Sequence, residues 1–178
     1  MLKLLDKTAF GTVFKIMEHS FPLDEHRPYE EQEALLQREQ YRIVGAMGER
    51  GELAGFMAVW EFPEFLFLEH FAVAETYRNR GMGAAMLREL QAHCSKPICL
   101  EAELPNNELS RRRVAFYERN GFSLNPYPYI QPPISEGRNP VPLAIMTTGG
   151  QISADCFSTI KDRLYSEVYH VSRDPEMA

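Results

Sequence analysis

The sequence is short of cysteine and of positive charge. Its 178 residues include three cysteines, an odd number. Because no Cys-x-x-Cys spacing occurs, we expect neither a disulfide framework nor a zinc site, and no bound metal. Lysine and arginine number 19 against 25 aspartate and glutamate, and the formal net charge is -6. Nucleic-acid binding needs a basic surface to contact phosphates, so a nucleic-acid partner is excluded.

Long hydrophobic runs are also missing. No stretch approaches the roughly 18 apolar residues of a membrane-spanning helix. The first residues, Met1–Asp6, reach a charged side chain after only a few apolar ones, which does not fit a secretion signal. We therefore expect a cytoplasmic protein with no membrane partner. The hydrophobic fraction of 44% and the charged fraction of 25% are ordinary for a globular protein, and the length predicts a single domain over residues 1–178.

The first half of the chain shows clear helix and strand signals after a short strand at Leu2–Leu5. One helix is predicted with Thr8 as its N-cap and an end before Pro22, and a second is predicted to start at Pro28. Three strands are then predicted to pair as antiparallel neighbours: Tyr41–Met47, Leu53–Glu61 and Phe65–Val73. After them, a glycine-containing turn, a helix and another strand predict a parallel crossover.

The second half predicts a helix over Ser110–Asn120, closed by the left-handed residue Gly121. Prolines and glycines crowd the segment Pro126–Pro142, which predicts a long loop or an irregular edge before a strand at Val141–Thr147. The last element is an amphipathic helix over Asp155–Val171. Its apolar stripe is predicted to pack on the chain's own sheet, and a homodimer contact is the alternative.

The strongest local signal for chemistry is the loop Arg78–Gly83, where a strand runs through two glycines into a helix. The first N–H groups of a helix have no intrahelical partner and lie at the positive end of its dipole, so they can bind an anion. Glycine also lets a bulky pyrophosphate approach the backbone. A purely steric turn is the competing interpretation. A P-loop is excluded because no GxxxxGK[ST] occurs, and a Rossmann fingerprint because Met86 replaces its third glycine.

Two stretches together resemble the GNAT superfamily of acetyl-coenzyme A-dependent N-acetyltransferases. The loop Arg78-Asn79-Arg80-Gly81-Met82-Gly83 is similar to the family's [RQ]-x-x-G-x-[GA] signature, and it follows a strand that ends in valine. The later segment Arg113–Phe122, with its Phe-Tyr-Glu triplet and its Gly-Phe pair, resembles a second family motif. The resemblance covers most of the chain. It implies an α/β fold with a mixed central sheet of about seven strands flanked by helices, with an extra C-terminal helix.

The resemblance also implies acetyl-coenzyme A as the cosubstrate. In the family, the pantetheine arm pairs with the backbone of the strand before the loop, and the pyrophosphate lies on the loop. The residues that would bind it here are Phe71, Ala72, Val73, Arg78, Asn79, Arg80, Gly81, Met82, Gly83 and Ala84. Family members often have an asparagine seven residues before the motif tyrosine. Here that position is Ser110, so Asn106 or Asn107 would have to make its contact.

Transfer to an amine requires a base, because an alkyl amine with a pKa near 10.4 is almost fully protonated at pH 7. Glu69 lies four residues before Val73, a position where related enzymes carry a base. Strand alternation predicts Glu69 and Phe71 on one face and His70 on the other. A solvated strand carboxylate is the alternative role for Glu69, and His70 or a water molecule could be the effective base instead.

Tyr117 is implied by the resemblance to be the general acid that protonates the departing thiolate, and a packing tyrosine is the alternative. The acceptor is expected to be a primary amine of a small molecule, and the acidic composition favours a cationic one. Its lining is predicted to include Glu25, Arg27, Tyr29, Tyr127 and Tyr129. Two other functions stay open: a non-catalytic acyl-coenzyme A-binding regulatory module, and a protein or peptide N-acetyltransferase.

Overall fold

A computed structural model describes residues 1–172, which form two compact units. The first unit contains Met1–Pro22 and Pro28–Cys99, and the second contains Leu23–Arg27 together with the described residues from Leu100 onward. The single domain expected over residues 1–178 stays a prediction. Within residues 1–172, no helix is both long enough and apolar enough to cross a membrane.

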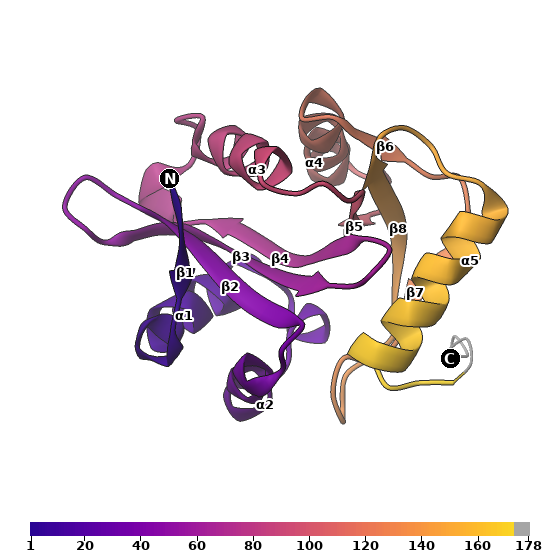
Figure 1. The fold of residues 1–178 in the computed structure, drawn as a ribbon, viewed down its shortest axis with the longest axis horizontal. Coiled ribbons are helices and arrows are strands. Elements are labelled where there is room, and N and C mark those ends of the chain that lie inside the picture. The colour runs from indigo at the N-terminus through magenta and orange to yellow at the C-terminus, as the bar shows by residue number, and fades with distance from the viewer. Residues whose placement is uncertain (173–178) are drawn as a thin grey trace. The chain divides into compact units, whose positions relative to one another are not determined.

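The first unit is built on four antiparallel strands in the order β1, β2, β3, β4 (Figure 1). Helices α1 and α2 lie on one side of these strands and α3 on the other (Figure 1). All residues of β3 except the first and the last are buried, so β3 is the centre of this unit. The strand bounds are β1 Leu2–Leu5, β2 Tyr41–Met47, β3 Leu53–Glu61 and β4 Leu66–Val73. The prediction of three successive antiparallel strands is confirmed.

The first helix begins differently from the prediction. A 3-10 turn at Lys7–Ala9 precedes α1, which spans Phe10–Ser20. The cap of the 3-10 turn is Asp6, whose carboxylate accepts the backbone N–H of Thr8 at 2.9 Å. The N-cap position of α1 is Ala9, which makes no side-chain cap bond, so the predicted Thr8 cap is wrong. The hydroxyl and amide of Thr8 lower the pKa of Asp6. The second helix, α2, spans Tyr29–Ala34 after Pro28, as predicted.

Helix α3, Met82–Ala92, connects β4 to β5, which spans Ile98–Glu103. Its buried side chains, Met86, Leu87 and Leu90, form the apolar face of the helix. The N–H at the start of β4, on Leu66, donates to the carbonyl of Pro97 just before β5 at 2.9 Å. Because the two strands therefore start side by side, the predicted parallel crossover is confirmed.

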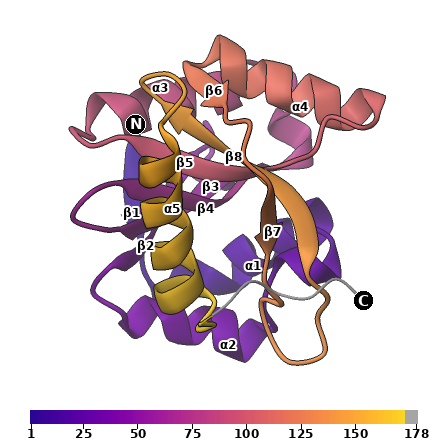
Figure 2. The ribbon, with the colours of Figure 1, turned by 90° about the vertical axis from the view of Figure 1, so that its right-hand side faces the viewer.

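The second unit contains the rest of β5 and three further strands, with the helices α4 and α5 (Figure 2). Helix α4 spans Glu108–Arg119 and is followed by Gly121 at φ 87, the predicted left-handed residue. The strands are β6 Phe122–Leu124, β7 Tyr129–Gln131 and β8 Val141–Thr148. Strands β6 and β7 pair with β8, each in antiparallel register.

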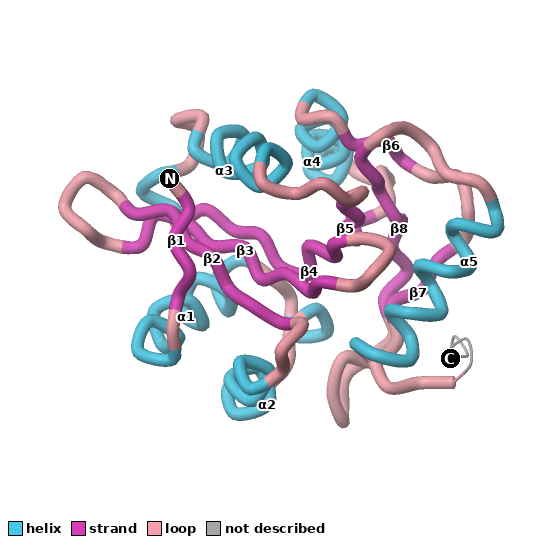
Figure 3. Tube along the Cα trace, viewed as in Figure 1, coloured by secondary structure: helices cyan, strands magenta, loops and turns pink. Residues whose placement is uncertain are grey.

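Strand β7 lies inside the segment that was predicted to be a long loop or an irregular edge, and its pairing with β8 fits the irregular edge (Figure 3). Leu124 pairs with Met146 and Tyr129 with Leu143. From Leu124 to Tyr129 the chain advances five residues, while β8 advances only three between their partners. The two extra residues form the proline-rich excursion around Tyr127. Strands β6 and β7 are therefore two halves of one interrupted strand. Within residues 1–172 there are eight strands, against about seven expected, and the predicted α/β class with a mixed sheet is confirmed.

The C-terminal helix is shorter than predicted. Helix α5 spans Ala154–Arg163 and continues as a π-helical turn over Leu164–Val168. The wider turn, in which Tyr169 N–H donates to the Leu164 carbonyl at 3.0 Å, ends the regular helix before Val171. The hydroxyl of Tyr165 donates to the Ile130 carbonyl in β7 at 2.6 Å. Phe157 of the apolar stripe lies against the same strand, with its ring centroid 6.4 Å from that of Tyr129, so the stripe packs on a strand of its own unit, as expected.

Gly55 generates a prediction about stability. A Cβ atom at this position in β3 would lie 2.9 Å from the backbone oxygen of Ala72 and 3.1 Å from the sulfur of Met86. Because β4 cannot retreat without weakening its pairing with β3, we expect Gly55→Ala to lower the free energy of unfolding by about 1–3 kcal/mol. Chemical denaturation measures the change.

Gly11→Ala is the matched control, because a Cβ there would meet only the Tyr29 hydroxyl, at 3.9 Å. In helix α1 this change should cause no loss and a gain of up to about 1 kcal/mol. Equal stability of Gly55→Ala and the unchanged protein would contradict the tight contact between β3 and β4.

Candidate functional site

The predicted anion-binding loop ends at the start of α3. Gly81 caps the helix with φ 76, and Asn79 also has a positive φ of 60. The first helical bond runs from the Ala85 N–H to the Gly81 carbonyl at 3.0 Å. The N–H groups of Met82, Gly83 and Ala84 therefore precede the hydrogen-bond ladder and point out of the positive end of the helix. A Cβ at Gly81 would meet no atom within 4 Å, so the backbone conformation, rather than crowding, requires glycine there.

The two arginines of the loop have different surroundings. Arg78 makes two hydrogen bonds within the first unit: its Nε donates to the Val73 carbonyl at 3.0 Å, and an Nη donates to the Ser20 hydroxyl at 3.3 Å. Arg80 is exposed. A guanidinium and helix N–H groups are donors of the kind that bind phosphate. The loop thus offers donors that could bind a pyrophosphate. Both arginines are exposed, and Arg78 also makes hydrogen bonds within the first unit.

Strand β4 leads into this loop and carries a bulge at Glu69. Ala58 of β3 pairs with His70 and Val59 pairs with Leu68, which leaves Glu69 as the extra residue of β4. After the bulge, the pairing is regular through Phe71, Ala72 and Val73, which face Met57, Phe56 and Gly55. These are the three residues whose backbone was expected to bind the pantetheine arm, and they form a regular strand on the β3 side.

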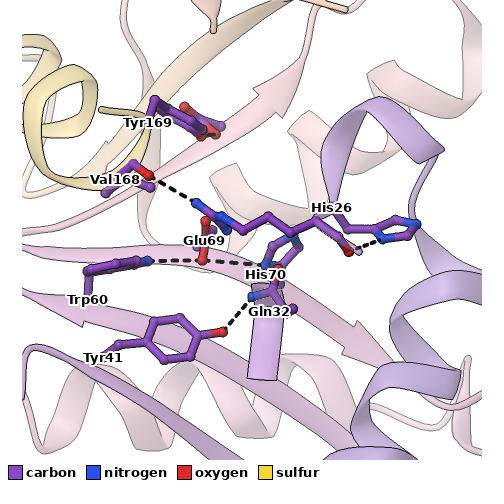
Figure 4. A network of polar contacts seen from close by, with 10 residues as sticks. His26, Gln32, Tyr41, Trp60, Glu69, His70, Val168 and Tyr169 are labelled. Atoms are coloured by element: carbon purple, nitrogen blue, oxygen red, sulfur yellow. Dashed lines mark hydrogen bonds and ion pairs between the residues drawn. The ribbon is translucent and has the colours of Figure 1, made fainter. Parts of the chain in front are cut away.

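Glu69 is held by its neighbours in the first unit (Figure 4). Its carboxylate accepts the indole N–H of Trp60 at 2.9 Å and lies 3.6 Å from Nδ1 of His70. The side chains of Glu69 and His70 are only 2% and 1% exposed. The alternation that predicted these two side chains on opposite faces is therefore wrong at the bulge. Glu69 is a buried, hydrogen-bonded carboxylate rather than a solvated one.

Trp60 is a site residue that the sequence analysis missed. It lies on β3 between Tyr41, with ring centroids 5.1 Å apart, and Phe62, whose ring is stacked at 6.4 Å. Tyr41 in turn accepts a hydrogen bond from Gln32 at 2.8 Å. The signal was available, because Trp60 is the single tryptophan of the chain and lies on the strand predicted to pair with Glu69's own strand. What the sequence could not provide was the register.

Tyr117 lies on α4 in the second unit and is half-buried between aromatic rings. Its ring centroid is 5.4 Å from that of Phe116 and 5.8 Å from that of Phe122. Burial in these surroundings raises the pKa of Tyr117 to about 12, with Arg113 lowering it and Glu103 raising it to smaller extents. The hydroxyl is thus a proton donor, not an acceptor, at neutral pH.

Ser110 and Asn107 serve the start of α4. The Asn107 side chain accepts the Ser110 N–H at 2.9 Å, and the Ser110 hydroxyl accepts the Asn107 N–H at 3.1 Å. This reciprocal capping box uses both side chains. Of the two asparagines considered as substitutes for a cofactor contact, Asn106 is the one with an exposed side chain outside the cap.

The five predicted acceptor-lining residues are divided between the units. Tyr29, in the first unit, packs edge-on against Phe10 and Phe14 at 5.1 and 5.0 Å. In the second unit, Arg27 is 4% exposed and donates to the Val168 carbonyl at 3.1 Å. Glu25 lies two residues earlier, in the same unit.

Tyr127 and Tyr129 are brought together, because both line a cavity of about 410 Å³ in the second unit. The Tyr127 hydroxyl donates to the Ile152 carbonyl at 3.0 Å. The Tyr129 hydroxyl donates to the carboxylate of Glu101, which also accepts from Tyr169 at 2.7 Å. Burial and this carboxylate raise the pKa of Tyr129 well above its usual value. The two rings can therefore offer apolar surface to a ligand, while their hydroxyls bind the protein.

Comparison with known proteins gives a family match. The family model described as the acetyltransferase (GNAT) family matches residues 10–122. The solved structure of a GNAT-family protein from Bacteroides thetaiotaomicron is 30% identical, with a TM-score of 0.88, and the match covers 97% of this chain and 99% of that one. The structure of an aminoglycoside 6'-N-acetyltransferase complexed with coenzyme A is 16% identical, covers 83% of this chain and 96% of that one, and has a TM-score of 0.61. At this identity the likeness concerns the fold alone.

A curated relative adds a second kind of likeness. The spermine/spermidine N(1)-acetyltransferase of Bacillus subtilis strain 168 is 31% identical over 94 residues, which is 48% of this chain and 61% of the relative. The chain thus spans about three fifths of the length of this relative. Within residues 1–172, no cluster of three or more His, Cys, Asp or Glu side chains that could hold a metal is found.

The apolar surroundings of Tyr117 generate a prediction about its titration. The measurement is the ultraviolet absorbance of the unchanged protein minus that of Tyr117→Phe, followed as the pH is raised. We expect no phenolate absorbance from Tyr117 at a pH near the ordinary tyrosine pKa of about 10, because the pKa of Tyr117 is raised to about 12. By linkage, stability that is present below about pH 10 is lost as the pH rises through about 12. A difference signal with its midpoint near the ordinary pKa would contradict the burial of the hydroxyl.

Proposed function

The chain belongs to the acetyltransferase (GNAT) family, and we propose that it transfers an acetyl group from acetyl-coenzyme A to a primary amine of a small molecule. The observation that carries this proposal is the start of α3. There, the left-handed Gly81 precedes the N–H groups of Met82, Gly83 and Ala84, which are not used within the helix and are proposed to bind the pyrophosphate. Arg80 adds positive charge, and the backbone of Phe71–Val73 is proposed to bind the pantetheine arm.

Glu69 is proposed to accept the proton of the amine, directly or through a water molecule. The Trp60 N–H donates to its carboxylate, and the His70 ring lies beside it. The neutral amine nitrogen then forms a bond to the thioester carbonyl carbon while the carbon–sulfur bond breaks, without an acyl-enzyme. Tyr117, protonated at neutral pH because its pKa is raised to about 12, is proposed to protonate the thiolate. The attacking nitrogen loses its second proton as the amide forms, and that proton is proposed to restore the Tyr117 phenol. Its part in the reaction rests on the family resemblance.

The acceptor is proposed to be a cationic amine. The formal net charge of -6 favours a positively charged ligand, and one relative is a spermine/spermidine N(1)-acetyltransferase. Polyamines are therefore the first acceptors to test, followed by aminoglycosides and amino acids. A non-catalytic acyl-coenzyme A-binding module is distinguished by the same screen, since it would bind acetyl-coenzyme A and release no thiol with any amine.

The test is a screen of thiol release from acetyl-coenzyme A over these amines, followed by substitution of the proposed base. With an accepted amine, we expect Glu69→Gln to lower kcat by about 10²- to 10⁴-fold, while the Kd for acetyl-coenzyme A changes less than about twofold. Glutamine keeps the shape of the side chain and can still accept the Trp60 N–H, so the loss reports the missing base.

Glu61→Gln is the matched control, because Glu61 is a glutamate at the end of the neighbouring strand β3 but pairs with Arg42 and with Lys96, the latter at 3.5 Å. It should leave kcat unchanged. Full turnover by Glu69→Gln would remove Glu69 as the base, and loss of acetyl-coenzyme A binding instead of turnover would assign it a structural role.

A further inference from the structure

We propose that Tyr77 and Glu52 form a clamp that positions the anion-binding loop, by joining it to the hairpin between β2 and β3. The proposal rests on the proposed function, since it assigns these residues to coenzyme A binding. Neither residue would touch the cofactor itself. They are positioning residues, and Glu52 lies 25 positions before Tyr77 in the sequence. All residues of the clamp belong to the first unit.

Glu52 connects two turns through its two carboxylate oxygens. Its Oε2 accepts the backbone N–H of Arg50 at 3.0 Å, inside the β2–β3 hairpin. Its Oε1 accepts the hydroxyl of Tyr77, which lies on the turn that leads into the loop. This bond lowers the pKa of Glu52 and raises the pKa of Tyr77, so the carboxylate is charged and the phenol is protonated at neutral pH. A charge-assisted hydrogen bond of this kind is stronger than a neutral one.

The hairpin is itself closed by short backbone bonds. The Gly48 N–H donates to the Glu52 carbonyl at 2.7 Å, and the Gly51 N–H donates to the Gly48 carbonyl at 3.1 Å. The Tyr77 ring also packs closely against the hairpin at Gly48. A Cβ atom built there would collide with the Tyr77 hydroxyl and lie 2.7 Å from the ring carbon that carries it. Only glycine at this position lets the ring lie against the hairpin.

Tyr77 is placed where its restraint reaches the loop directly. It ends the 3-10 turn Glu75–Tyr77, in which its N–H donates to the Ala74 carbonyl at 2.8 Å. The next residue, Arg78, is bound to the Val73 carbonyl and to Ser20. The chain entering the loop is thus held on one side by the hairpin and on the other by β4 and the end of α1.

The residues beyond this double restraint carry the candidate phosphate donors. Asn79 and Gly81 both have positive φ angles, and such a backbone must be held in place if it is to present its N–H groups in one arrangement. A loop that is ordered before binding loses less conformational entropy when the ligand binds, so the restraint should increase the affinity for coenzyme A. Release of Tyr77 from Glu52 should therefore weaken the binding of coenzyme A and leave the chemical step intact.

The experiment measures the Kd of coenzyme A by calorimetry, which needs no knowledge of the amine. We expect Tyr77→Phe, which keeps the ring and removes the hydroxyl, to raise the Kd roughly tenfold. Glu52→Ala should have the same effect, and the double variant should bind no more than about twofold worse than either single variant, because both remove one interaction. With an accepted amine, the KM for acetyl-coenzyme A should rise with the Kd, while kcat at saturation stays within about twofold.

Arg42→Gln is the matched control, because its ion pair with Glu61 joins the same two strands at the end away from the turn. It should leave the Kd unchanged. Unchanged Kd values in both Tyr77→Phe and Glu52→Ala, with the unchanged protein binding coenzyme A, would overturn the clamp alone. The clamp would also be overturned if the increase in Kd in the double variant equalled the product of the increases in the two single variants. If the unchanged protein binds no coenzyme A, the proposed function fails, and the clamp with it. If Tyr77→Phe does not fold, Glu52→Ala carries the comparison.

Discussion

The pairing of β3 with β4 is the constraint on which the first unit depends. Seated in the buried centre of the unit, β3 determines where each residue of β4 can lie. The register places Glu69 at a bulge, opposite no single partner, and directs its carboxylate to Trp60. The same register brings Val73 to Gly55, where the absence of a side chain permits close approach. The end of β4 and the helix that follows therefore start from a defined point.

Much of this fold could be predicted because its signals are local. Tyr41–Met47 and Leu53–Glu61 are apolar runs bounded by glycine and charged residues, and both strands have the predicted limits. The features that were missed depend on partners distant in sequence or on small changes in backbone geometry. Tyr129–Gln131 is a strand because β8 supplies its hydrogen bonds, despite the prolines around it. Apolar spacing cannot distinguish an α-helical turn from the π-helical turn at Leu164–Val168.

In the candidate site, too, the local features could be predicted and the contacts between residues distant in sequence could not. At the loop Arg78–Gly83, the helix start and the left-handed Gly81 could be predicted, because glycines before an apolar periodic segment are local signals. The partners of each side chain could not. Two arginines two residues apart look equivalent in a motif, which gives no sign that Arg78 donates to the Val73 carbonyl and to the Ser20 hydroxyl. Likewise, Glu69 and His70 approach each other only because a bulge interrupts the alternation that separates neighbours on a regular strand.

Trp60 also makes the site visible to an optical experiment. The chain has one tryptophan, so its indole emission comes from a single place, and that indole donates to Glu69 at 2.9 Å. Emission from an indole responds to charge and hydrogen bonding at its nitrogen. The protein thus contains an intrinsic fluorescent reporter in contact with the carboxylate, and events at this side chain can be followed in the unlabelled molecule.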